Sequence, residues 1–506
     1  MARCHWSLLH IPAHVIAALN ESSGTRDRSP CPTALTDYLR HCSMHGVRYI
    51  VEEGRHWSER LLWAVGVLAG LVGMVLFMRE VWQQVAESPT VVSVASTEHY
   101  LLGTDFPAVT ICSVNKVQRS AATRFYRKWG LQAVLSAGDF EAFVRQLAGL
   151  TQPERFRGAL PHRLADMTAF LAARNLSLRD VMLQLAPSCE SLMVRCLWRK
   201  QIVNCSQLFT RQKSDAGFCC SFNYNTDGPL RKVEGEGYTQ GLTVLVDPLL
   251  DDYYVAAYSF HGLQVLVHSP VDYPFVATRS VIVRPRTETF IQRGSAACAC
   301  RQVDVTVTES APAMRGLQPS RRPCLFGEDP AARRHGPRYS AGNCLLRCRS
   351  RLIHDACGCA PYHYLYTGDF NWLSVRTAQV DGHHDCLCRP LCDTVSFHTT
   401  VTSGDLFNSN YDYNSFFGDV QIVNQTILHV YLQELLTLRY RRDVLYNWNS
   451  LIGSLGGSAG LFLGCSLLSV LELLYFVTLR ALCALRRRRV QPPHVSMAYV
   501  ASGPKA

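Results

Sequence analysis

The sequence predicts a membrane protein with two transmembrane helices and a large disulfide-rich α+β extracellular domain between them. Two long apolar runs lie towards the two ends of the 506-residue chain, and sixteen of its 21 cysteines fall between these runs. Strand-like and helix-like segments are mixed over the same region, which predicts an α+β fold rather than an all-helical one.

The first apolar run, Leu61–Met78, has 18 uncharged residues, the threshold length for a membrane helix. Charged residues flank it on both sides. It begins too far into the chain for a signal peptide and lacks the small-residue cleavage pattern. We therefore expect a retained span over residues 61–79, preceded by a cytosolic segment over residues 1–60.

The second run, Leu451–Leu479, is 29 residues long and differs from a simple anchor. It holds five glycines, and each glycine weakens a helix by roughly 1 kcal/mol relative to alanine. Glu472 lies deep in the run, where a charge costs at least about 2.5 kcal/mol and usually marks a water-filled path. As one helix the run would extend roughly 43 Å, beyond a hydrocarbon core of about 30 Å, so it must tilt, break or begin outside the bilayer.

The second run also predicts a close helix contact and the wall of a pore. Gly456, Gly460 and Gly464 recur at every fourth residue, which is the small-residue face on which membrane helices approach each other. A glycine-rich span with a deep carboxylate therefore indicates a pore-lining helix over residues 451–479.

Charge sets the orientation. Arg480 and Arg486–Arg489 follow the second span, and the positive-inside rule places them in the cytoplasm. Two spans bring the N-terminus to the same side, so residues 80–450 are expected outside and residues 480–506 form a basic cytosolic tail. We expect a multi-pass plasma-membrane protein with both termini cytosolic. The basic cluster has no aromatic side chains between its arginines, so it does not resemble a nucleic-acid-binding surface. The extracellular side agrees with three candidate glycosylation sequons, at Asn175, Asn204 and Asn424.

An even number of cysteines in an oxidising compartment predicts a disulfide framework. The alternative is zinc, because two Cys-x-Cys pairs occur at Cys357/Cys359 and Cys386/Cys388, the second close to His383 and His384. The one-residue spacing is shorter than the two to four residues of zinc sites, and no cluster completes four ligands. We therefore expect no metal and no cofactor.

Between the spans the secondary structure changes along the chain. Helical spacing predicts helices from about Ala121 to Leu185 and over Cys344–Ile353. The Pro- and Arg-rich stretch Ser310–His335 is expected to be a loop or hinge, and Ile422–Tyr440 a strand followed by a helix. Strands from distant segments are expected to meet in one central sheet. The predicted strands are Thr90–Ala95, Ala108–Ile111, Leu242–Val246, Leu263–Val267, Ser280–Val283 and Thr394–Thr402.

Six motifs occur in an order that resembles a known family. They are His45-Gly46, FPAVTIC at Phe106–Cys112, GFCCSFN at Gly217–Asn223, His268-Ser-Pro with Asp272-Tyr-Pro274, CLCRPLC at Cys386–Cys392, and GLFLGCSLLSVLE at Gly460–Glu472. With these motifs the chain resembles the epithelial sodium channel/degenerin superfamily, and within it the insect pickpocket-like branch. The resemblance covers nearly the whole chain.

The resemblance implies a trimeric channel architecture. Members are cation channels, generally sodium-selective and blocked by amiloride, with an extracellular body likened to a hand. It implies a β-rich palm core with a helical finger and thumb. The expected partners are sodium ions, two further subunits of the same or a related type, and membrane lipid. The extracellular ligand is unknown.

The resemblance also assigns a selectivity filter and a gate. The last helix would break at Gly464-Cys465-Ser466, where freed carbonyls can line a water-filled path. Glu472 would form a carboxylate ring at the inner mouth, and His45-Gly46 matches the gating motif. The outer gate is expected at Gly453, Ser454 and Gly457; acid-sensing members carry an aspartate at Ser454, which argues against proton gating.

Simpler roles remain open for the same residues. The glycines and serine of the filter motif would then be helix-packing residues. Glu472 would snorkel, or pair with His45 or an arginine.

The family pattern implies five disulfides and leaves others open. Cys189 with Cys220 is a candidate sixth pair. The chain departs from the pattern because no cysteines lie between Cys359 and Cys386, while Cys298 and Cys300 are additional. The implied pairs are Cys112–Cys219, Cys196–Cys205, Cys324–Cys392, Cys344–Cys388 and Cys348–Cys386.

Three alternatives to a conducting channel subunit differ in what they need. A non-conducting modulatory subunit or surface receptor of the same fold would share every motif. An ATP-gated channel would need another cysteine array and phosphate-binding lysines, which are few here. An ectoenzyme is disfavoured because no nucleophile-elbow, zinc-protease or paired-carboxylate motif stands out.

Overall fold

The computed structural model describes residues 34–480 apart from 134, 150, 152–169, 225–228, 294–304, 334–338, 358–361, 365–385, 387, 407–415, 417–419 and 421. The chain divides into two compact units. Unit 1 combines the two ends of the chain, up to Ser88 and from Tyr446. Unit 2 is the middle, Pro89–Leu445.

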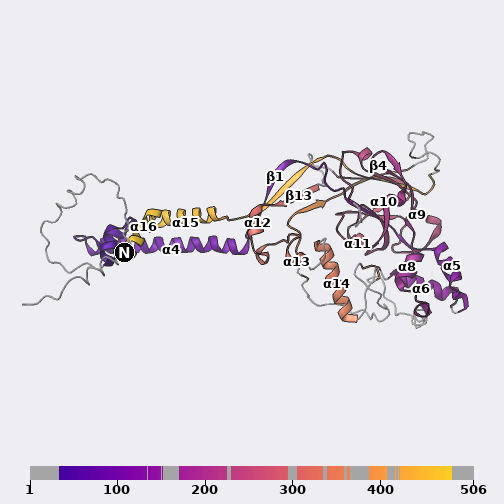
Figure 1. The fold of residues 1–506 in the computed structure, drawn as a ribbon, viewed down its shortest axis with the longest axis horizontal. Coiled ribbons are helices and arrows are strands. Elements are labelled where there is room, and N and C mark those ends of the chain that lie inside the picture. Colours follow the sequence, from indigo (N-terminus) through magenta and orange to yellow (C-terminus); the bar gives the residue numbers. More distant parts are fainter. Residues whose placement is uncertain are drawn as a thin grey trace, which may run out of the picture. The chain divides into compact units, whose positions relative to one another are not determined.

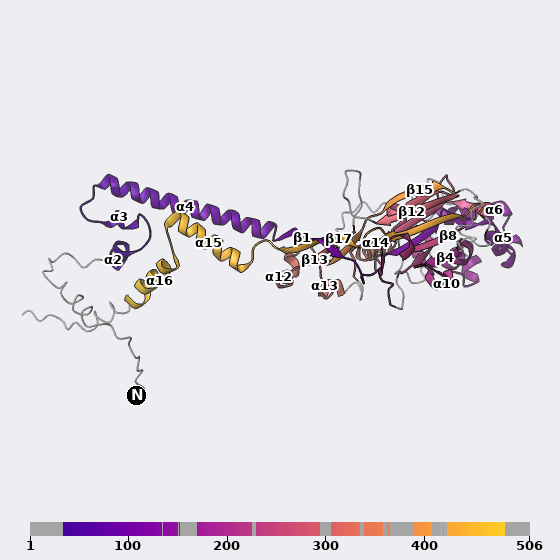
Figure 2. The same cartoon turned by 90° about the horizontal axis from the view of Figure 1, so that it is seen from above.

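Unit 1 is helical. Its 31-residue helix α4 (Trp57–Glu87) contains the first apolar run and extends it at both ends. Helix α15 (Trp448–Leu463) packs along α4, as two views show (Figure 1, Figure 2). Among the described residues α4 alone is long and apolar enough to cross a membrane by itself; α15 and the helix after it pass the same test only as a pair bent by 77°. The remaining elements are α2 (Ala34–His41), α3 (Val47–Val51), α16 (Leu467–Tyr475) and a π-helical turn, Phe476–Arg480.

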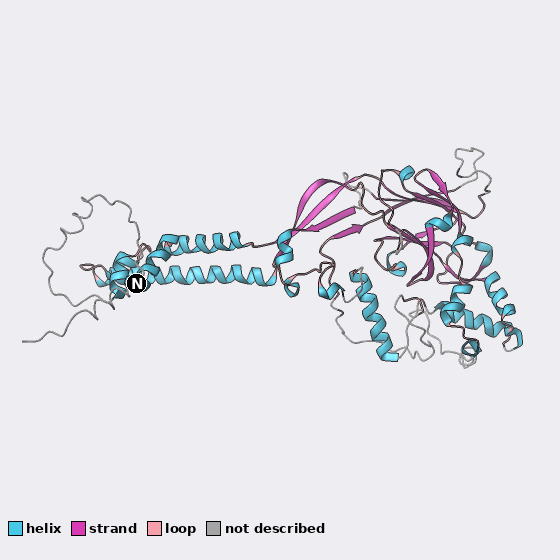
Figure 3. Cartoon of the chain, in the orientation of Figure 1, coloured by secondary structure: helices cyan, strands magenta, loops and turns pink. Residues whose placement is uncertain are grey.

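Unit 2 mixes strands and short helices (Figure 3). Its described strands form four sheets rather than the single central sheet expected. The four-stranded sheet runs β1 (Thr90–Tyr100), β17 (Leu436–Val444), β13 (Val305–Ser310), β14 (Thr394–Phe397). The five-stranded sheet runs β11 (Val281–Val283), β10 (Leu263–His268), β2 (Ala108–Ser113), β7 (Gly217–Phe222), β6 (Phe209–Ser214).

The six-stranded sheet runs β15 (Thr400–Asp405), β12 (Thr287–Arg293), β16 (Thr426–Leu432), β8 (Leu242–Val246), β4 (Met193–Trp198), β5 (Gln201–Val203). The last sheet pairs β3 (Asn115–Gln118) with β9 (Tyr253–Ala256). Two pairings are parallel, β12 with β16 and β13 with β17. Each joins strands more than a hundred residues apart, so the sheets depend on long-range pairing.

The main core lies between the five- and six-stranded sheets. Ile111, Phe222 and Val265 of the first meet Val244 and Leu428 of the second in one buried cluster. All six residues of β2 are buried, which matches a strand with no exposed face. A second core is formed by the helices that follow β3, with Phe125, Phe140, Val144 and Val181 among its members.

The described helices of unit 2 are mostly short. The longer ones are α5 (Arg119–Lys128), α6 (Ala137–Gly149), α8 (Leu178–Leu185) and α14 (Ala341–Cys357). One-turn helices are α9 (Cys189–Leu192), α10 (Cys205–Leu208), α11 (Val276–Arg279), α12 (Pro312–Gly316) and α13 (Pro330–Arg333). Four 3₁₀ turns complete the set: η1 (Leu131–Ala133), η3 (Tyr238–Gln240), η4 (Leu250–Asp252) and η5 (Pro319–Arg321).

Three sequence predictions in unit 2 are wrong in part. The stretch Ser310–His335 contains α12, η5 and α13. Three of its four prolines, at 312, 319 and 330, each open a short helix, because the first helical position needs no N–H donor. The predicted strand Thr394–Thr402 is two strands in different sheets. Ile422–Tyr440 holds β16 and the start of β17 and no helix, because β-branched and aromatic residues pack there against sheet neighbours.

Candidate functional site

The second apolar run breaks at Gly464-Cys465-Ser466. Gly464 ends α15 with φ +65°, in the left-handed region that favours glycine. The Cys465 N–H donates back to the Ala459 carbonyl at 3.1 Å. The excess length seen in the sequence therefore corresponds to two helices in place of one.

Ser466 begins the next helix. Its Oγ accepts from the Ser469 N–H at 3.4 Å, and its own N–H donates to the Ser469 Oγ at 3.1 Å, a reciprocal capping arrangement. The break is thus specified on both sides, by glycine at the end of α15 and by serine at the start of α16.

The loop before α3 lies against this break. The His45 N–H donates to the Leu463 carbonyl at 3.2 Å, one of the carbonyls that the end of α15 leaves without a helical partner. The His45 ring lies so close to Gly464 that a Cβ there would collide with it. Two motifs separated by more than four hundred residues, His45-Gly46 and Gly464-Cys465-Ser466, therefore form one site.

Gly46 is needed for its backbone and for its size. It has φ +83° and precedes α3. A Cβ at Gly46 would lie 3.0 Å from Cγ2 of Val67 and 3.1 Å from Cε3 of Trp63, both on α4. The loop can thus lie between α4 and the break only because glycine occupies this position.

Glu472 is bound by the same loop. Its Oε2 accepts from the Ser43 N–H at 3.1 Å, and the Ser43 Oγ is hydrogen-bonded to the Ser469 Oγ at 2.7 Å. Among the described side chains, neither His45 nor an arginine pairs with this carboxylate. Its carboxylate is half-buried one turn beyond Ser469, so the N-terminal loop and the inner part of the broken helix share a polar contact.

The close helix contact involves glycines that the sequence analysis did not single out. A Cβ at Gly70 of α4 would lie 2.6 Å from the Phe462 carbonyl oxygen, and one at Gly73 would lie 2.8 Å from the Phe462 ring. The glycine face of α15 does not make this contact within one chain, because a Cβ at Gly456 would meet nothing within 4 Å and one at Gly460 would meet only the Cys465 carbonyl oxygen, at 3.7 Å. The spacing of glycines in the first run could have indicated this.

The residues expected at the outer gate lie open within one chain. Gly453 and Gly457 are exposed, and a Cβ at either would meet nothing within 4 Å. Ser454 is half-buried. The neighbouring Ser458 is the serine that faces α4, where its Oγ lies 3.4 Å from the Met78 sulfur.

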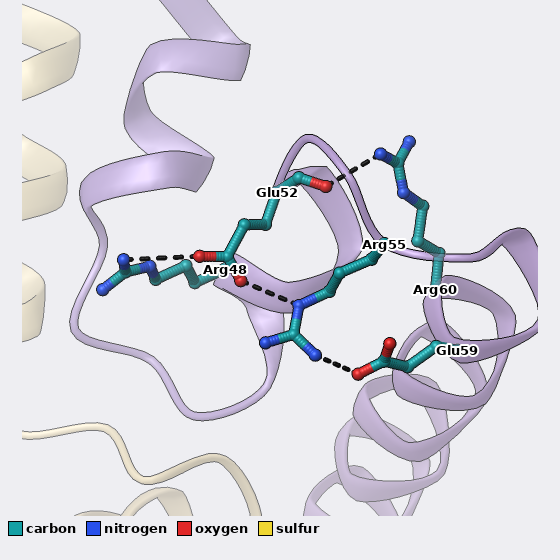
Figure 4. Close-up of polar contacts among 5 residues, drawn as sticks. All are labelled: Arg48, Glu52, Arg55, Glu59 and Arg60. Atoms are coloured by element: carbon teal, nitrogen blue, oxygen red, sulfur yellow. Dashed lines mark hydrogen bonds and ion pairs between the residues drawn. The ribbon is translucent and has the colours of Figure 1, made fainter.

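A charged network at the start of α4 is a second feature that the sequence analysis missed (Figure 4). Arg55 donates to Glu52 at 2.8 Å and pairs with Glu59. Arg48 reaches the other Glu52 oxygen at 3.5 Å, and Arg60 donates to the Glu52 carbonyl at 2.8 Å. The hydrogen bond from Arg55 is the main cause that lowers the pKa of Glu52. The i, i+3 and i, i+4 spacing of these residues is visible in the sequence.

Six disulfides are described in unit 2. Five join the cysteines paired by the family pattern, Cys112–Cys219, Cys196–Cys205, Cys324–Cys392, Cys344–Cys388 and Cys348–Cys386. The sixth joins Cys189 and Cys220. Two of them tie α14 to the segment after residue 385. The residues of the zinc alternative and the additional cysteines that lie outside the described part of the chain are Cys298, Cys300, Cys359, His383, His384 and the side chain of Cys357. Within the described part, no group of three or more His, Cys, Asp or Glu residues could hold a metal ion.

The three sequons differ in their surroundings. Asn175 and Asn204 are exposed, and the Asn204 carboxamide accepts from the Ser206 N–H at 3.1 Å. Asn424 is half-buried, and its oxygen accepts from the Arg286 guanidinium at 2.9 and 3.2 Å.

An apolar helix that opens its backbone at a glycine, with a carboxylate just beyond, is typical of ion-conducting membrane proteins rather than of anchors. Comparison with known proteins agrees with this class. Residues 38–476 match the family described as "Amiloride-sensitive sodium channel". The chain therefore belongs to this family of membrane channels, and its relatives place it in the insect branch of the epithelial sodium channel/degenerin superfamily.

Similar proteins cover most of the chain. Pickpocket protein 28 of Drosophila melanogaster is 23% identical over 91% of this chain and 81% of its own length. Sodium channel protein Nach of the same species is 24% identical, covering 87% of this chain and 86% of its own. Acid-sensing ion channel 2 of Rattus norvegicus is 25% identical, covering 88% and 86%. The family is one of ion channels and not of enzymes, in agreement with the sequence analysis.

Proposed function

We propose that the chain is a subunit of a trimeric, sodium-permeable cation channel of the amiloride-sensitive type, gated through its extracellular domain. The observation that carries the proposal is the break at Gly464-Cys465-Ser466 inside an apolar helix pair. Ions move down their electrochemical gradient through such a break and need no chemical step.

The proposed topology has two spans and a plasma-membrane location. Helix α4 forms one span, and α15 with α16 forms the other. Both termini are cytosolic and unit 2 is extracellular. The arginines after the second span and the six disulfides of unit 2 support this orientation.

The proposed filter is formed by three copies of Gly464-Cys465-Ser466 around one axis. Carbonyls freed at the break replace part of the hydration shell of the ion. Three copies of Glu472 form a carboxylate ring at the inner mouth, which attracts cations and repels anions. The hydrogen bond from Ser43 holds each carboxylate in place without neutralising its charge.

The proposed gate has an outer and an inner part. Gly453, Ser454 and Gly457 form the outer part. His45-Gly46 forms the inner part, on the cytosolic side, and influences the filter through its contact with the break. A Cβ at Gly453 would meet nothing within 4 Å beyond the backbone of its own helix, which supports an effect on the gate through other subunits across the axis.

Expression of the chain alone tests the proposal. We expect Gly453→Val to raise the resting sodium current, because a bulky side chain at the axis disfavours the closed arrangement. Whole-cell recording with and without amiloride measures it, beside surface biotinylation. Gly66→Val is the matched control, since it introduces the same side chain into open space on α4 and should leave the resting current unchanged.

The opposite outcome is informative. If Gly453→Val is expressed alone, reaches the cell surface at the normal level and carries no current, the proposal is contradicted. It would favour a modulatory subunit that does not conduct.

A further inference from the structure

Arg55 connects two helices of unit 1, and the proposed function leaves this residue without a role. It lies in the turn between α3 and α4, and its side chain is half-buried. Its Nε donates to Glu52 at 2.8 Å, and its Nη1 pairs with Glu59 (Figure 4). Glu52 directly follows α3 and Glu59 lies in the first turn of α4. One guanidinium therefore joins the end of one helix to the start of the next.

Two aromatic rings form a second layer of the same contact. The Arg55 guanidinium carbon lies 4.5 Å from the centroid of the Tyr49 ring, on α3. The centroid of the Tyr49 ring lies 4.7 Å from that of the Trp63 ring, on α4. Arg60 of α4 adds a third contact, because it donates to the Glu52 carbonyl oxygen at 2.8 Å, just beyond the last turn of α3. Charged and aromatic contacts together hold α3 on α4.

Helix α3 needs these contacts for its position. It has five residues, whereas isolated helices shorter than about 12 residues are marginal in water. The loop before it (residues 42–46, the His45 loop) reaches the broken span. The His45 N–H donates to the Leu463 carbonyl at 3.2 Å, and the Ser43 N–H donates to a Glu472 oxygen at 3.1 Å. A displacement of α3 on α4 would therefore move the His45 loop away from the break.

The arrangement at Arg55 differs from an ordinary surface ion pair, which contributes little to stability. The planar guanidinium presents its N–H groups in a fixed fork, and here the fork binds two carboxylates at once. Its face lies over an aromatic ring, which adds a cation–π attraction. A lysine at this position would keep the charge and lose the fork.

We propose that Arg55 is a positioning residue of the ion path. Its guanidinium locks α3 onto the first turn of α4, and α3 in turn holds the His45 loop against the break at Gly464-Cys465-Ser466. Arg55 acts through the loop, since the contacts described above join it to α3 and α4. Its effect on the loop rests on these contacts, and its effect on ions rests on the proposed function.

Hydrogen–deuterium exchange of the full-length protein in detergent tests the effect on the loop without any current. The Ser43 and His45 amides are protected only while the loop lies against the broken span, because their acceptors lie there. In Arg55→Gln we expect these amides to exchange about fivefold faster than in the wild type. Mass spectrometry of the peptides that cover the loop measures the rate.

Two further variants separate the fork from the charge and from unrelated ion pairs. Arg145→Gln is the matched control, because it breaks an i, i+4 ion pair with Glu141 at 2.6 Å in α6 of unit 2 and should leave the loop exchange unchanged. Arg55→Lys keeps the charge and loses the fork, so its loop should exchange faster than that of the wild type. Wild-type exchange in Arg55→Gln or in Arg55→Lys overturns the proposal. Exchange that rises equally along all of α4 and α15 also overturns it, because unit 1 would then be loosened as a whole.

A double-mutant cycle identifies the partners of Arg55. Glu52→Gln combined with Glu59→Gln should speed the loop exchange as Arg55→Gln does, and the bond from Arg60 remains because it uses a backbone carbonyl. Adding Arg55→Gln to this pair should then bring little further change. Fully additive effects would show that Arg55 does not act through the two carboxylates and would overturn the assignment.

Reversal potentials test the consequence for ions. With sodium or potassium outside the cell, Arg55→Gln at normal surface level should show a lower sodium-to-potassium permeability ratio than the wild type, while Arg145→Gln should keep the wild-type ratio. Faster loop exchange with an unchanged ratio overturns the consequence for ions. A wild-type chain that never conducts contradicts the proposed function, and the exchange rates then still decide whether Arg55 holds the loop.

Discussion

Single residues at the break decide whether the two halves of the second span and the N-terminal loop fit together. Gly464 combines a left-handed backbone with contact to the His45 ring, two reasons for glycine that act independently. The sequence indicated that this region would break. It could not show that His45 lies against Gly464, because the contact joins residues more than four hundred positions apart.

Gly464→Ala is expected to lower the amount of channel at the surface and its current. A left-handed alanine costs about 1–2 kcal/mol, and its Cβ collides with the His45 ring. His45→Ala added to Gly464→Ala should recover part of the surface level, because the collision is removed and the backbone strain remains. Surface biotinylation measures both.

Gly460→Ala is the matched control for that experiment. Its Cβ would meet only the Cys465 carbonyl, at an ordinary 3.7 Å, so it should be tolerated. Equal surface levels of Gly464→Ala and Gly460→Ala would contradict the argument.

At the scale of elements, local pattern predicted most of what is local. β8 has the predicted bounds Leu242–Val246, and α14 contains the predicted helix at 344–353. The helix expected before residue 440 was wrong, because strands β16 and β17 satisfy their backbones with partners that are far away in sequence. The packing of α4 against α15 likewise could not be read from either run alone.

Gly70→Ala and Gly66→Ala are expected to change the stability of unit 1 in opposite directions. Both gain about 1 kcal/mol of helix propensity. At Gly70 the new Cβ lies 2.6 Å from the Phe462 carbonyl oxygen, and such overpacking costs about 1–3 kcal/mol. At Gly66 it meets nothing.

Thermal denaturation of the detergent-solubilised channel, followed by size-exclusion chromatography, measures the difference. Gly66→Ala should melt at or above the wild-type temperature and Gly70→Ala below it. A lower midpoint for Gly66→Ala than for Gly70→Ala would refute the contact between α4 and Phe462.

For the whole molecule, the fold depends on pairings that a single sequence does not reveal. Both ends of the chain form unit 1, and four sheets of unit 2 are assembled from separated segments. Motif order recovered the family and five disulfides, because these are properties of the sequence order. The number of sheets and the contact of His45 with the break required coordinates.

Unit 2 also buries titratable groups whose charge links its stability to pH. His363 is 7% exposed, and burial, helped by the charge of Lys213, lowers its pKa from 6.5 to about 3. Lys116 is 6% exposed, and burial lowers its pKa from 10.5 to about 8. In the pH range between its unfolded and folded pKa values, each group binds a proton in the unfolded chain but not in the folded one. The free energy of unfolding therefore decreases as the pH falls from 10.5 to about 8 for Lys116 and from 6.5 to about 3 for His363.

The pH dependence of unfolding is therefore expected to change in His363→Phe. Between pH 6.5 and 3 the unfolded wild-type chain binds a proton at this position that the folded chain does not, so stability falls by up to about 1.4 kcal/mol for each pH unit. Phenylalanine keeps a ring between Tyr362 and Tyr364 and removes the titration. Tryptophan fluorescence of the full-length protein, melted at pH 7.5, 6, 5 and about 4.5, measures the slope; it should be shallower in His363→Phe and unchanged in the exposed control His398→Phe. Parallel slopes in all three proteins would show that His363 is not held neutral in the folded chain.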